Sequence, residues 1–407
     1  MRTVGGGDSK GHIVSDCTDS QHSRGLIRAK DVEVVKVMAN TRIRRGLLGA
    51  LVVTLAGAPA LAEGQIPHPQ DEAIARGSRP YRSEDVSFAN ERAHIDLAGT
   101  FSVPDGEGPF PAVLLIAASG PEGRDEEVAG HRVFVVLAGY LLRQGVAVLR
   151  YDKRGVRAST GDLDKASFDD LVSDAATAFR YLKTRPEVNM RCLGIIGHSE
   201  GGSIAPAVAA SDKDVAFVVA MAGSGLSGEF RITESQVYMA KEQGASSEQQ
   251  ERIRVMCQQI FRTVAATSDD VAARVRIETL IRAAIARNTL KPEEAEPMRE
   301  LLTPQFVRQE LQDNPVSYLA RVHVPVLAFV GSLDRIVPAG PYVEAMRPAL
   351  AGIPGSKVLV LPGLNHVMQT AQTGSPREFG SIEESISPLA LKTIGDWIAE
   401  QVRSHSR

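Results

Sequence analysis

Cysteine is scarce in this 407-residue chain, which has only Cys17, Cys192 and Cys257 and no C-x-x-C pair. The sequence therefore gives no basis for a disulfide framework. None of the nine histidines stands at the spacing of a metal-ligand set, so a structural zinc is not expected either. We expect neither a metal nor a nucleotide cofactor.

The chain also lacks an excess of positive charge. Its formal net charge is −3, and Lys and Arg are scattered along the sequence, which argues against a nucleic-acid partner. With 43% hydrophobic and 23% charged residues, the composition is that of an ordinary globular protein of one or two domains. The sequence does not indicate an oligomeric state.

The apolar run at residues 46–61 is about 16 residues long, shorter than the roughly 20 that a transmembrane helix needs. It follows a positively charged stretch and ends in Ala60-Leu61-Ala62, a small-x-small cleavage pattern. Residues 38–62 are therefore predicted to be a secretory signal peptide, with an uncleaved membrane anchor as the alternative. Residues 1–37 are expected to be an untranslated or disordered extension. We expect a periplasmic or secreted protein that begins at Glu63 and has no stable membrane insertion.

Strand-like and helix-like segments alternate from about residue 85 onward. The first strands, near 86–88 and 93–103, alternate apolar and polar residues and suggest an antiparallel start to a sheet. Short apolar runs typical of buried parallel strands follow at 112–117, 147–151, 192–196, 216–222, 324–330 and 357–361. Helices are expected at 133–142 and 168–182. The pattern predicts an α/β fold with a doubly wound, mostly parallel sheet, whose ligands bind beyond the carboxyl ends of the strands.

About a hundred residues after position 222 contain no strand-like run, which is long for a connection inside one domain. Residues 229–265 and 269–287 have helical composition and spacing. We therefore predict a helical cap at residues 226–319, inserted between two parts of the core at 83–225 and 320–404. An independent helical domain and a disordered linker are the alternatives, and the regular apolar spacing argues against disorder.

Ser199 lies in the sequence Gly197-His198-Ser199-Glu200-Gly201-Gly202, between an apolar strand and a helix that is expected from residue 203. Gly197 and Gly201 carry no Cβ atoms that would collide in a sharp strand-to-helix turn. Such a turn exposes the serine Oγ at the carboxyl edge of the sheet and is called a nucleophile elbow. Ser199 is the predicted nucleophile.

A serine hydroxyl is a weak nucleophile at neutral pH, so it needs a histidine to take its proton and a carboxylate to orient that histidine. In this fold the chain order is serine, acid, histidine. Asp334 directly follows one predicted strand and His366 follows the next, so both are expected at the edge of the sheet where Ser199 lies. A turn or helix cap is the alternative for Asp334. His198 adjoins Ser199 and cannot fold back to serve as its base.

An oxyanion hole requires backbone N–H groups around the substrate oxygen. One donor is expected to be the amide of Glu200, directly after the nucleophile. The other is expected from the loop at 118–125, where Gly120 is the first candidate and Ser119 the second. A plain turn would contain the same residues.

Two further motifs admit a structural interpretation. Residues 223–228 match G-x-G-x-x-G, but a helical region follows where a dinucleotide-binding fold needs a second strand with an acidic end, so a flexible lead into the cap is expected. Residues 151–155, Tyr-Asp-Lys-Arg-Gly, end a strand at the catalytic edge. There Asp152 and Arg154 are expected to clamp neighbouring loops, with substrate binding as the alternative.

Together these motifs resemble the bacterial α/β-hydrolase esterases related to the prolyl oligopeptidase and dienelactone hydrolase groups. The resemblance covers roughly residues 83–404. Relatives usually continue the Arg-Gly stretch with Val-Gly-x-Ser, whereas Arg157 here takes the place of the second glycine. The resemblance implies a cofactor-free carboxylesterase for short acyl or small aryl esters. A serine peptidase acting on short peptides and a non-catalytic binding module are the alternatives. The motifs that carry the resemblance lie at residues 119–121, 151–155, 197–202, 331–334 and 364–366.

Overall fold

The computed structural model describes residues 69–70, 80–223, 225–312 and 315–405, all of which fall in one compact unit, Ile43–Arg407. The predicted signal peptide at 38–62 and the extension at 1–37 lie outside the described residues. Within the described ranges, none of the helices has the length and apolar character needed to cross a bilayer.

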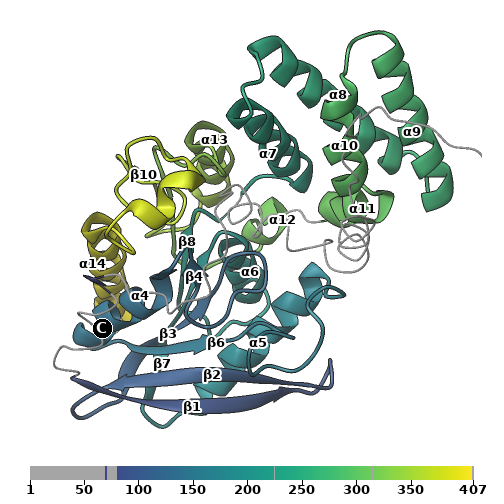
Figure 1. The fold of residues 1–407 in the computed structure, drawn as a ribbon. Coiled ribbons are helices and arrows are strands. Elements are labelled where there is room, and N and C mark those ends of the chain that lie inside the picture. Colours follow the sequence, from purple (N-terminus) through teal and green to yellow (C-terminus); the bar gives the residue numbers. More distant parts are fainter. Residues whose placement is uncertain (1–68, 71–79, 224, 313–314, 406–407) are drawn as a thin grey trace, which may run out of the picture. The chain divides into compact units, whose positions relative to one another are not determined.

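An eight-stranded sheet forms the centre of this unit, in the order β1-β2-β6-β3-β7-β8-β9-β10 (Figure 1). β1 pairs antiparallel with β2 and β2 antiparallel with β6, whereas all the other pairs are parallel. The predicted α/β-hydrolase type of sheet, mostly parallel with an antiparallel start, is therefore confirmed. The strands are β1 (Tyr81–Asn90), β2 (Ile95–Pro104), β3 (Phe110–Ile116), β6 (Ala147–Tyr151), β7 (Val188–His198), β8 (Phe217–Met221), β9 (Val326–Gly331) and β10 (Lys357–Leu361).

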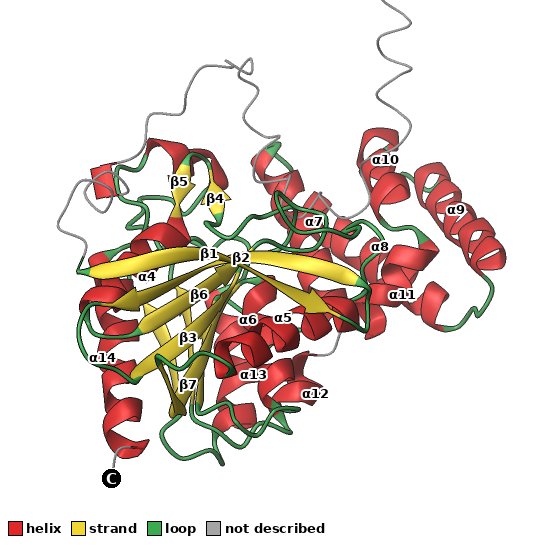
Figure 2. Cartoon of the chain, turned by 90° about the horizontal axis from the view of Figure 1, so that it is seen from below, coloured by secondary structure: helices red, strands yellow, loops and turns green. Residues whose placement is uncertain are grey.

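Helices cover both faces of the sheet. α4 (Val133–Arg143) and α14 (Pro388–His405) lie on one face, and α5 (Phe168–Lys183) and α6 (Glu200–Ala209) on the other (Figure 2). Every residue of β8 and β9 is buried, which explains why these strands are continuous apolar runs. α13 (Ala339–Leu350) connects β9 to β10, and the 3-10 helix η1 (Pro376–Ser381) precedes α14.

Most predicted elements agree with the structure to within a few residues, and β10 has the predicted bounds. α6 begins at Glu200 instead of residue 203, because the helix starts directly after Ser199, which occupies its N-cap position. The short hairpin of β4 (Glu127–Val128) and β5 (His131–Arg132) was not predicted. Its strands of two residues are too short to show a period of two.

The chain between β8 and β9 is helical, as the sequence predicts. The helices are α7 (Gly228–Glu242), α8 (Ser247–Ala265), α9 (Asp270–Ala286), α10 (Pro292–Leu301), α11 (Pro304–Gln312) and α12 (Pro315–Leu319). Helices α7 to α11 share an apolar cluster of their own, which includes Cys257, Ile260 and Phe261 of α8. Leu226 and Leu319, near the two ends of the insertion, belong instead to the main core. That this insertion caps an active site stays a prediction.

Candidate active site

Ser199 lies at the junction between β7 and α6, with φ 52° and ψ −114°. This left-handed φ is uncommon for a residue with a side chain and marks a strained turn. The N–H of Ser199 donates to the carbonyl oxygen of Met221 at 2.8 Å, which ties the turn to the end of β8. The backbone thus has the sharp strand-to-helix bend that the sequence predicts.

The glycines around Ser199 are required by close backbone approach. A Cβ on Gly197 would overlap the carbonyl of Gly201, and a Cβ on Gly201 would overlap the carbonyl oxygen of Ile116 at the end of β3. Because both obstacles are backbone atoms, they could yield only if the sheet edge moved. The elbow therefore fits directly against the end of β3.

Gly201→Ala is expected to destabilise the protein by about 3 kcal/mol or more, because overpacking a fully buried turn forces the backbone to shift. Gly340→Ala is the matched control, since Gly340 also lies in a helix but has open space around its Cβ position. Alanine there should be neutral or stabilising by at most about 1 kcal/mol. Urea unfolding of both variants decides the matter, and equal stabilities would contradict this account of the elbow.

Asp334 and His366 lie on the loops after β9 and β10, respectively. Nδ1 of His366 is 2.8 Å from Oδ2 of Asp334, and both side chains are almost fully buried. Oδ1 of Asp334 accepts hydrogen bonds from the backbone N–H groups of Ile336 at 2.8 Å and Val337 at 2.7 Å. The carboxylate is therefore held from one side by its own loop and presents its other oxygen to the histidine.

His366 also contacts the residue that precedes Ser199. Nε2 of His198 is 2.9 Å from the carbonyl oxygen of His366, and the centroids of the two imidazole rings are 5.0 Å apart. The structure thus brings together the three chain segments that carry Ser199, Asp334 and His366, which the sequence places at one edge of the sheet.

The two segments that are predicted to form the oxyanion hole are joined by a lysine. Nζ of Lys153 donates to the carbonyl oxygen of Ala118 and lies 2.8 Å from Oε2 of Glu200. Gly120, two residues after Ala118, has φ 93°, a conformation that side chains rarely adopt. The sequence analysis does not predict a role for Lys153, although this residue lies between Asp152 and Arg154 in the motif at 151–155.

Glu122 lies half-buried in the same loop as Gly120. Burial raises its pKa to about 7, with a further increase from the nearby carboxylate of Glu126 and an opposing effect from Lys153. A carboxyl group with a raised pKa favours the protonated state in the folded protein. Folding is therefore progressively weakened as the pH rises from 4.5, the ordinary value, toward 7.

Glu122→Gln is expected to remove this loss of stability. At pH 8 the variant should be more stable than the parent by up to about 3 kcal/mol, because each pH unit by which a pKa moves corresponds to about 1.4 kcal/mol. At pH 4 the two should be equally stable, since Glu122 is then protonated whether the chain is folded or unfolded. Urea unfolding at pH 4, 6 and 8 measures the difference. Glu107→Gln, in the exposed turn between β2 and β3, is the control. If the free energy of unfolding changed with pH in the same way for both variants, Glu122 would not be the source of the loss of stability.

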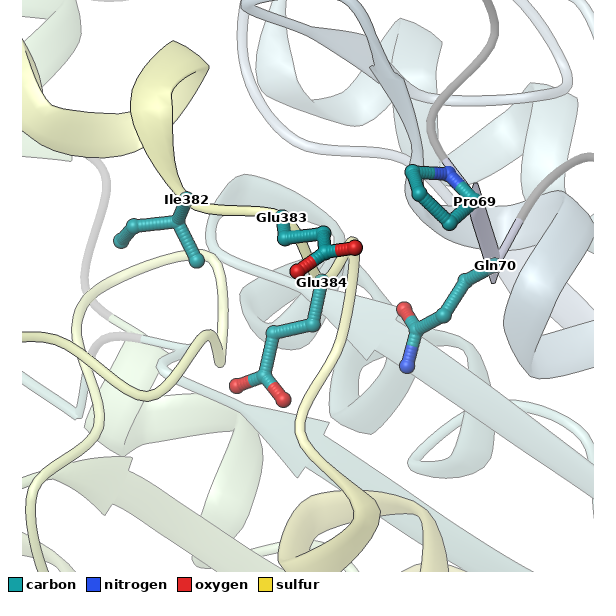
Figure 3. A pocket seen from close by; sticks show the side chains of 5 residues that line it. All are labelled: Pro69, Gln70, Ile382, Glu383 and Glu384. Atoms are coloured by element: carbon teal, nitrogen blue, oxygen red, sulfur yellow. The ribbon is translucent and has the colours of Figure 1, made fainter.

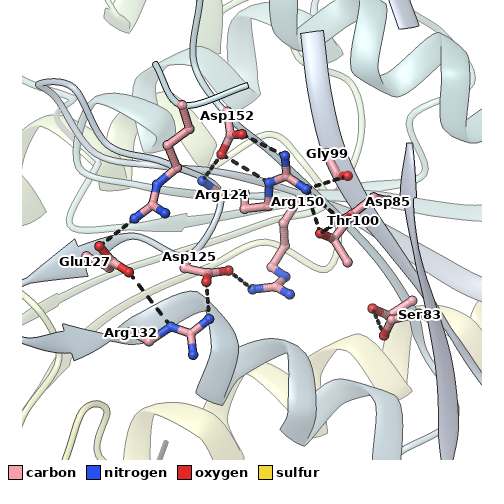
Figure 4. A network of polar contacts seen from close by, with 12 residues as sticks. Ser83, Asp85, Gly99, Thr100, Arg124, Asp125, Glu127, Arg132, Arg150 and Asp152 are labelled. Carbon is pink, nitrogen blue, oxygen red and sulfur yellow. Dashed lines mark hydrogen bonds and ion pairs between the residues drawn. The ribbon is translucent and has the colours of Figure 1, made fainter. Parts of the chain in front are cut away.

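Asp152 and Arg154 hold structural elements together. Asp152 is fully buried and accepts hydrogen bonds from the side chain and backbone N–H of Arg124, which also binds the carbonyl of Gly99 in β2 (Figure 4). Arg154 pairs with the buried carboxylate of Asp174 in α5 at 2.6 Å. Both side chains thus clamp neighbouring segments, and these contacts favour the structural interpretation of the motif over substrate binding.

Arg157 occupies the position where related sequences have glycine, and its φ is 49°. The backbone there keeps the left-handed conformation that glycine favours. The side chain of Arg157 lies against Gly123, where a Cβ would collide with it, and pairs with Glu127 at 2.5 Å. The side chain of Arg157 therefore fills the space beside Gly123, while its backbone has a conformation that glycine would also adopt.

A pocket of about 390 Å³ lies where residues 69–70 meet residues 382–386 (Figure 3). Oε1 of Gln70 accepts from the N–H groups of Ser385 at 2.6 Å and Ile386 at 3.1 Å, and its Nε2 donates to the carbonyl of Ile386 at 3.0 Å. The pocket is lined by Pro69, Gln70, Ile382, Glu383 and Glu384. Because none of the predicted site residues lines it, we do not assign it to the substrate.

Residues 91–348 match the model of the X-Pro dipeptidyl-peptidase (S15) family. The chain is 26% identical over 311 residues to the esterase EstD of Thermotoga maritima, a match that covers 75% of this chain and 66% of EstD. It is also 36% identical over 90 residues to the polyketide transferase grgF of Penicillium sp., covering 21% of this chain and 30% of that protein. The chain thus matches slightly less than two thirds of the length of EstD and a smaller part of grgF.

Among solved structures, the esterase Pf2001 of Pyrococcus furiosus superimposes with a TM-score of 0.50 at 15% identity, covering 84% of this chain and 96% of that chain. At this identity the likeness concerns the fold. It agrees with the mostly parallel sheet and interleaved helices described above. The family model and the match to EstD confirm the predicted kinship with bacterial esterase-like α/β hydrolases. The family model spans more than half of the sequence and includes Ser199 and Asp334. The chain belongs to the X-Pro dipeptidyl-peptidase (S15) family of hydrolytic enzymes.

Proposed function

We propose that this protein is a serine hydrolase that cleaves carboxylic esters, with Ser199 as nucleophile, His366 as base and Asp334 as the carboxylate that orients the base. The observation that carries the proposal is the 2.8 Å contact between Oδ2 of Asp334 and Nδ1 of His366, which lies on a loop that contacts His198, the residue before the strained Ser199. Family membership and the similarity to EstD support it.

In the first half of the proposed reaction, Oγ of Ser199 attacks the carbonyl carbon of the ester while Nε2 of His366 takes the hydroxyl proton. The negative charge that develops on the carbonyl oxygen is stabilised by the backbone N–H groups of Gly120 and Glu200. His366 then gives its proton to the departing alkoxide, which leaves as an alcohol. The acyl group stays on Ser199 as an ester.

In the second half, a water molecule attacks this acyl-enzyme and His366 takes a proton from it. The second tetrahedral intermediate collapses, the carboxylic acid leaves, and the proton on His366 returns to Ser199. Asp334 keeps its negative charge throughout, because its role is to hold the proton of His366 on Nδ1 and to stabilise the imidazolium. The proposed cycle needs no cofactor.

A peptidase acting on short peptides is the second candidate, because the matching family model is described as an X-Pro dipeptidyl-peptidase. A panel of p-nitrophenyl esters from acetate to octanoate, measured beside X-Pro p-nitroanilides, separates the two activities. We expect kcat/KM for the best short ester to exceed that for any anilide by at least about a hundredfold. The reverse order would replace esterase by peptidase.

We also propose that the protein acts after export, in the periplasm or outside the cell, on a small-molecule ester. The support is the predicted signal peptide at residues 38–62. N-terminal sequencing of protein from the periplasmic fraction should give a chain that begins at Glu63. A full-length chain retained in the cytoplasm would refute the proposed location.

A further inference from the structure

Glu126 and His198 form a fully buried pair behind the candidate active site. Their exposed fractions are 0% and 1%, and Oε1 of Glu126 lies 2.6 Å from Nδ1 of His198. The residues are 72 positions apart in the sequence, one in the loop after β3 and the other at the end of β7. Neither has a role in the reaction proposed above.

The pair touches three segments of the proposed machinery: the loop of Gly120, the elbow of Ser199 and the loop of His366. Oε1 of Glu126 also accepts a hydrogen bond from the N–H of Ala118 at 3.0 Å, in the loop that carries Gly120. His198 is covalently joined to Ser199, and its Nε2 contacts the carbonyl oxygen of His366 at 2.9 Å. A continuous chain of contacts therefore runs from the oxyanion loop through the nucleophile elbow to the backbone of the base.

The chemistry of these contacts fixes the protons on His198. A carbonyl oxygen can only accept, so Nε2 must carry a hydrogen. Burial lowers the pKa of His198, but the Glu126 carboxylate and the His366 carbonyl more than offset this, so the pKa lies above its ordinary value. One hydrogen therefore lies on Nε2 and points at the His366 carbonyl, and another lies between Nδ1 and Oε1 of Glu126, so that each ring nitrogen links His198 to a different segment.

Stability alone is a weak reason for such a pair. Burying an ionisable pair away from water costs much of what the attraction between its two members returns. In addition, Oε2 of Glu126 is buried without a hydrogen-bond partner among the described residues, and Glu126 has a left-handed φ of 50°. A strained backbone and an unpaired oxygen are unfavourable for folding, so this pair is better explained by a role in holding the neighbouring segments in place.

We propose that Glu126 and His198 are positioning residues, which fix the backbone of His366 and the loop of Gly120 relative to Ser199. This inference rests on the proposed function. Because Nε2 of His366 must lie within hydrogen-bond reach of Oγ of Ser199, a small displacement of the His366 backbone lowers the rate of proton transfer. Substrate binding, which does not depend on that distance, is left nearly unchanged.

Two substitutions at the same position separate positioning from simple loss of stability. The side-chain nitrogen of glutamine can reach the place of Nε2 and donate to the carbonyl of His366, whereas that of asparagine reaches only the place of Nδ1. His198→Gln thus keeps the link to the base, and His198→Asn keeps the link to Glu126. Each variant breaks one of the two links, so their losses of stability should be similar.

With a p-nitrophenyl ester of a short acid, His198→Asn is expected to lower kcat by roughly a hundredfold with KM changed less than about threefold. The kcat of His198→Gln should be at least about tenfold higher than that of His198→Asn. Asn90→Ala is the stability control, because it removes a buried hydrogen bond to Asp174 of 2.7 Å outside the site and should leave kcat unchanged. Equal kcat for the two His198 variants would overturn the inference.

If neither His198 variant folds, Glu126→Gln decides the question, since it keeps the shape of the side chain and removes only its charge. We expect a fall in kcat of about tenfold at constant KM, because hydrogen bonds to an ionised group are about twice as strong as neutral ones. An unchanged kcat would overturn the inference. Ser199→Ala, measured in parallel, separates the two proposals: if it keeps its activity, the proposed function fails, and if it is inactive while the other variants match the parent, only the positioning role fails.

Discussion

Replacing Ser199 by alanine is expected to lower kcat for ester hydrolysis by roughly 10⁴-fold or more. The substitution deletes the oxygen that forms the acyl-enzyme, so His366 has no hydroxyl to activate. The remaining rate comes from substrate binding and from charge stabilisation by the backbone N–H groups. In related mechanisms this residual rate is still higher than the rate of the reaction in water.

The fold should not change, because the deleted atom takes no part in the backbone contacts of the elbow. The N–H of Ser199 still donates to Met221, and alanine tolerates the left-handed φ about as well as serine does. Thermal unfolding should therefore show a Tm within about two degrees of the parent. A fluorophosphonate probe should label the parent protein and not the variant.

Ser211→Ala is the matched control. Ser211 lies just beyond the other end of α6, where its Oγ donates to the carbonyl of Ala207 at 3.3 Å, so the same atom is lost far from the elbow. This control should keep the parent kcat. If Ser199→Ala retained activity within about tenfold of the parent, Ser199 would not be the nucleophile.

The centre of the sheet could be predicted because its strands are buried on both faces. β8 and β9 are continuous apolar runs, and the charged or glycine-rich segments between such runs mark their ends. Ser199 could be predicted for a related reason, since the local sequence carries the whole constraint: Gly197 and Gly201 lie within two residues of the bend they permit. Features encoded in consecutive residues are the ones that a single sequence reveals.

Glu126 could not be predicted as part of the site. It lies in an acidic stretch, Asp125-Glu126-Glu127, that is typical of a solvated loop. Its burial depends on where the loop after β3 meets the end of β7, and that is set by the register of β3 against β7. Lys153 was missed for the same reason, because its two partners come from the loop after β3 and the first turn of α6.

Asp334→Asn is expected to lower kcat by roughly 10⁴-fold while KM and stability change little. The reason is the fixed orientation of the new amide. The N–H groups of Ile336 and Val337 donate to Oδ1 of Asp334, so the amide oxygen must take that place and the NH₂ group must face His366.

An NH₂ group can only donate, so Nδ1 of His366 would have to accept, and the single proton of the neutral ring would move to Nε2. In that tautomer Nε2 has no lone pair for the proton of Ser199, and the base is lost although every heavy atom keeps its place. Asp396→Asn, on α14, removes the same charge from an exposed pair with Lys392 and should leave kcat unchanged. Steady-state kinetics on one p-nitrophenyl ester compares the two. If Asp334→Asn matched this control, the carboxylate that orients His366 would lie elsewhere in the protein.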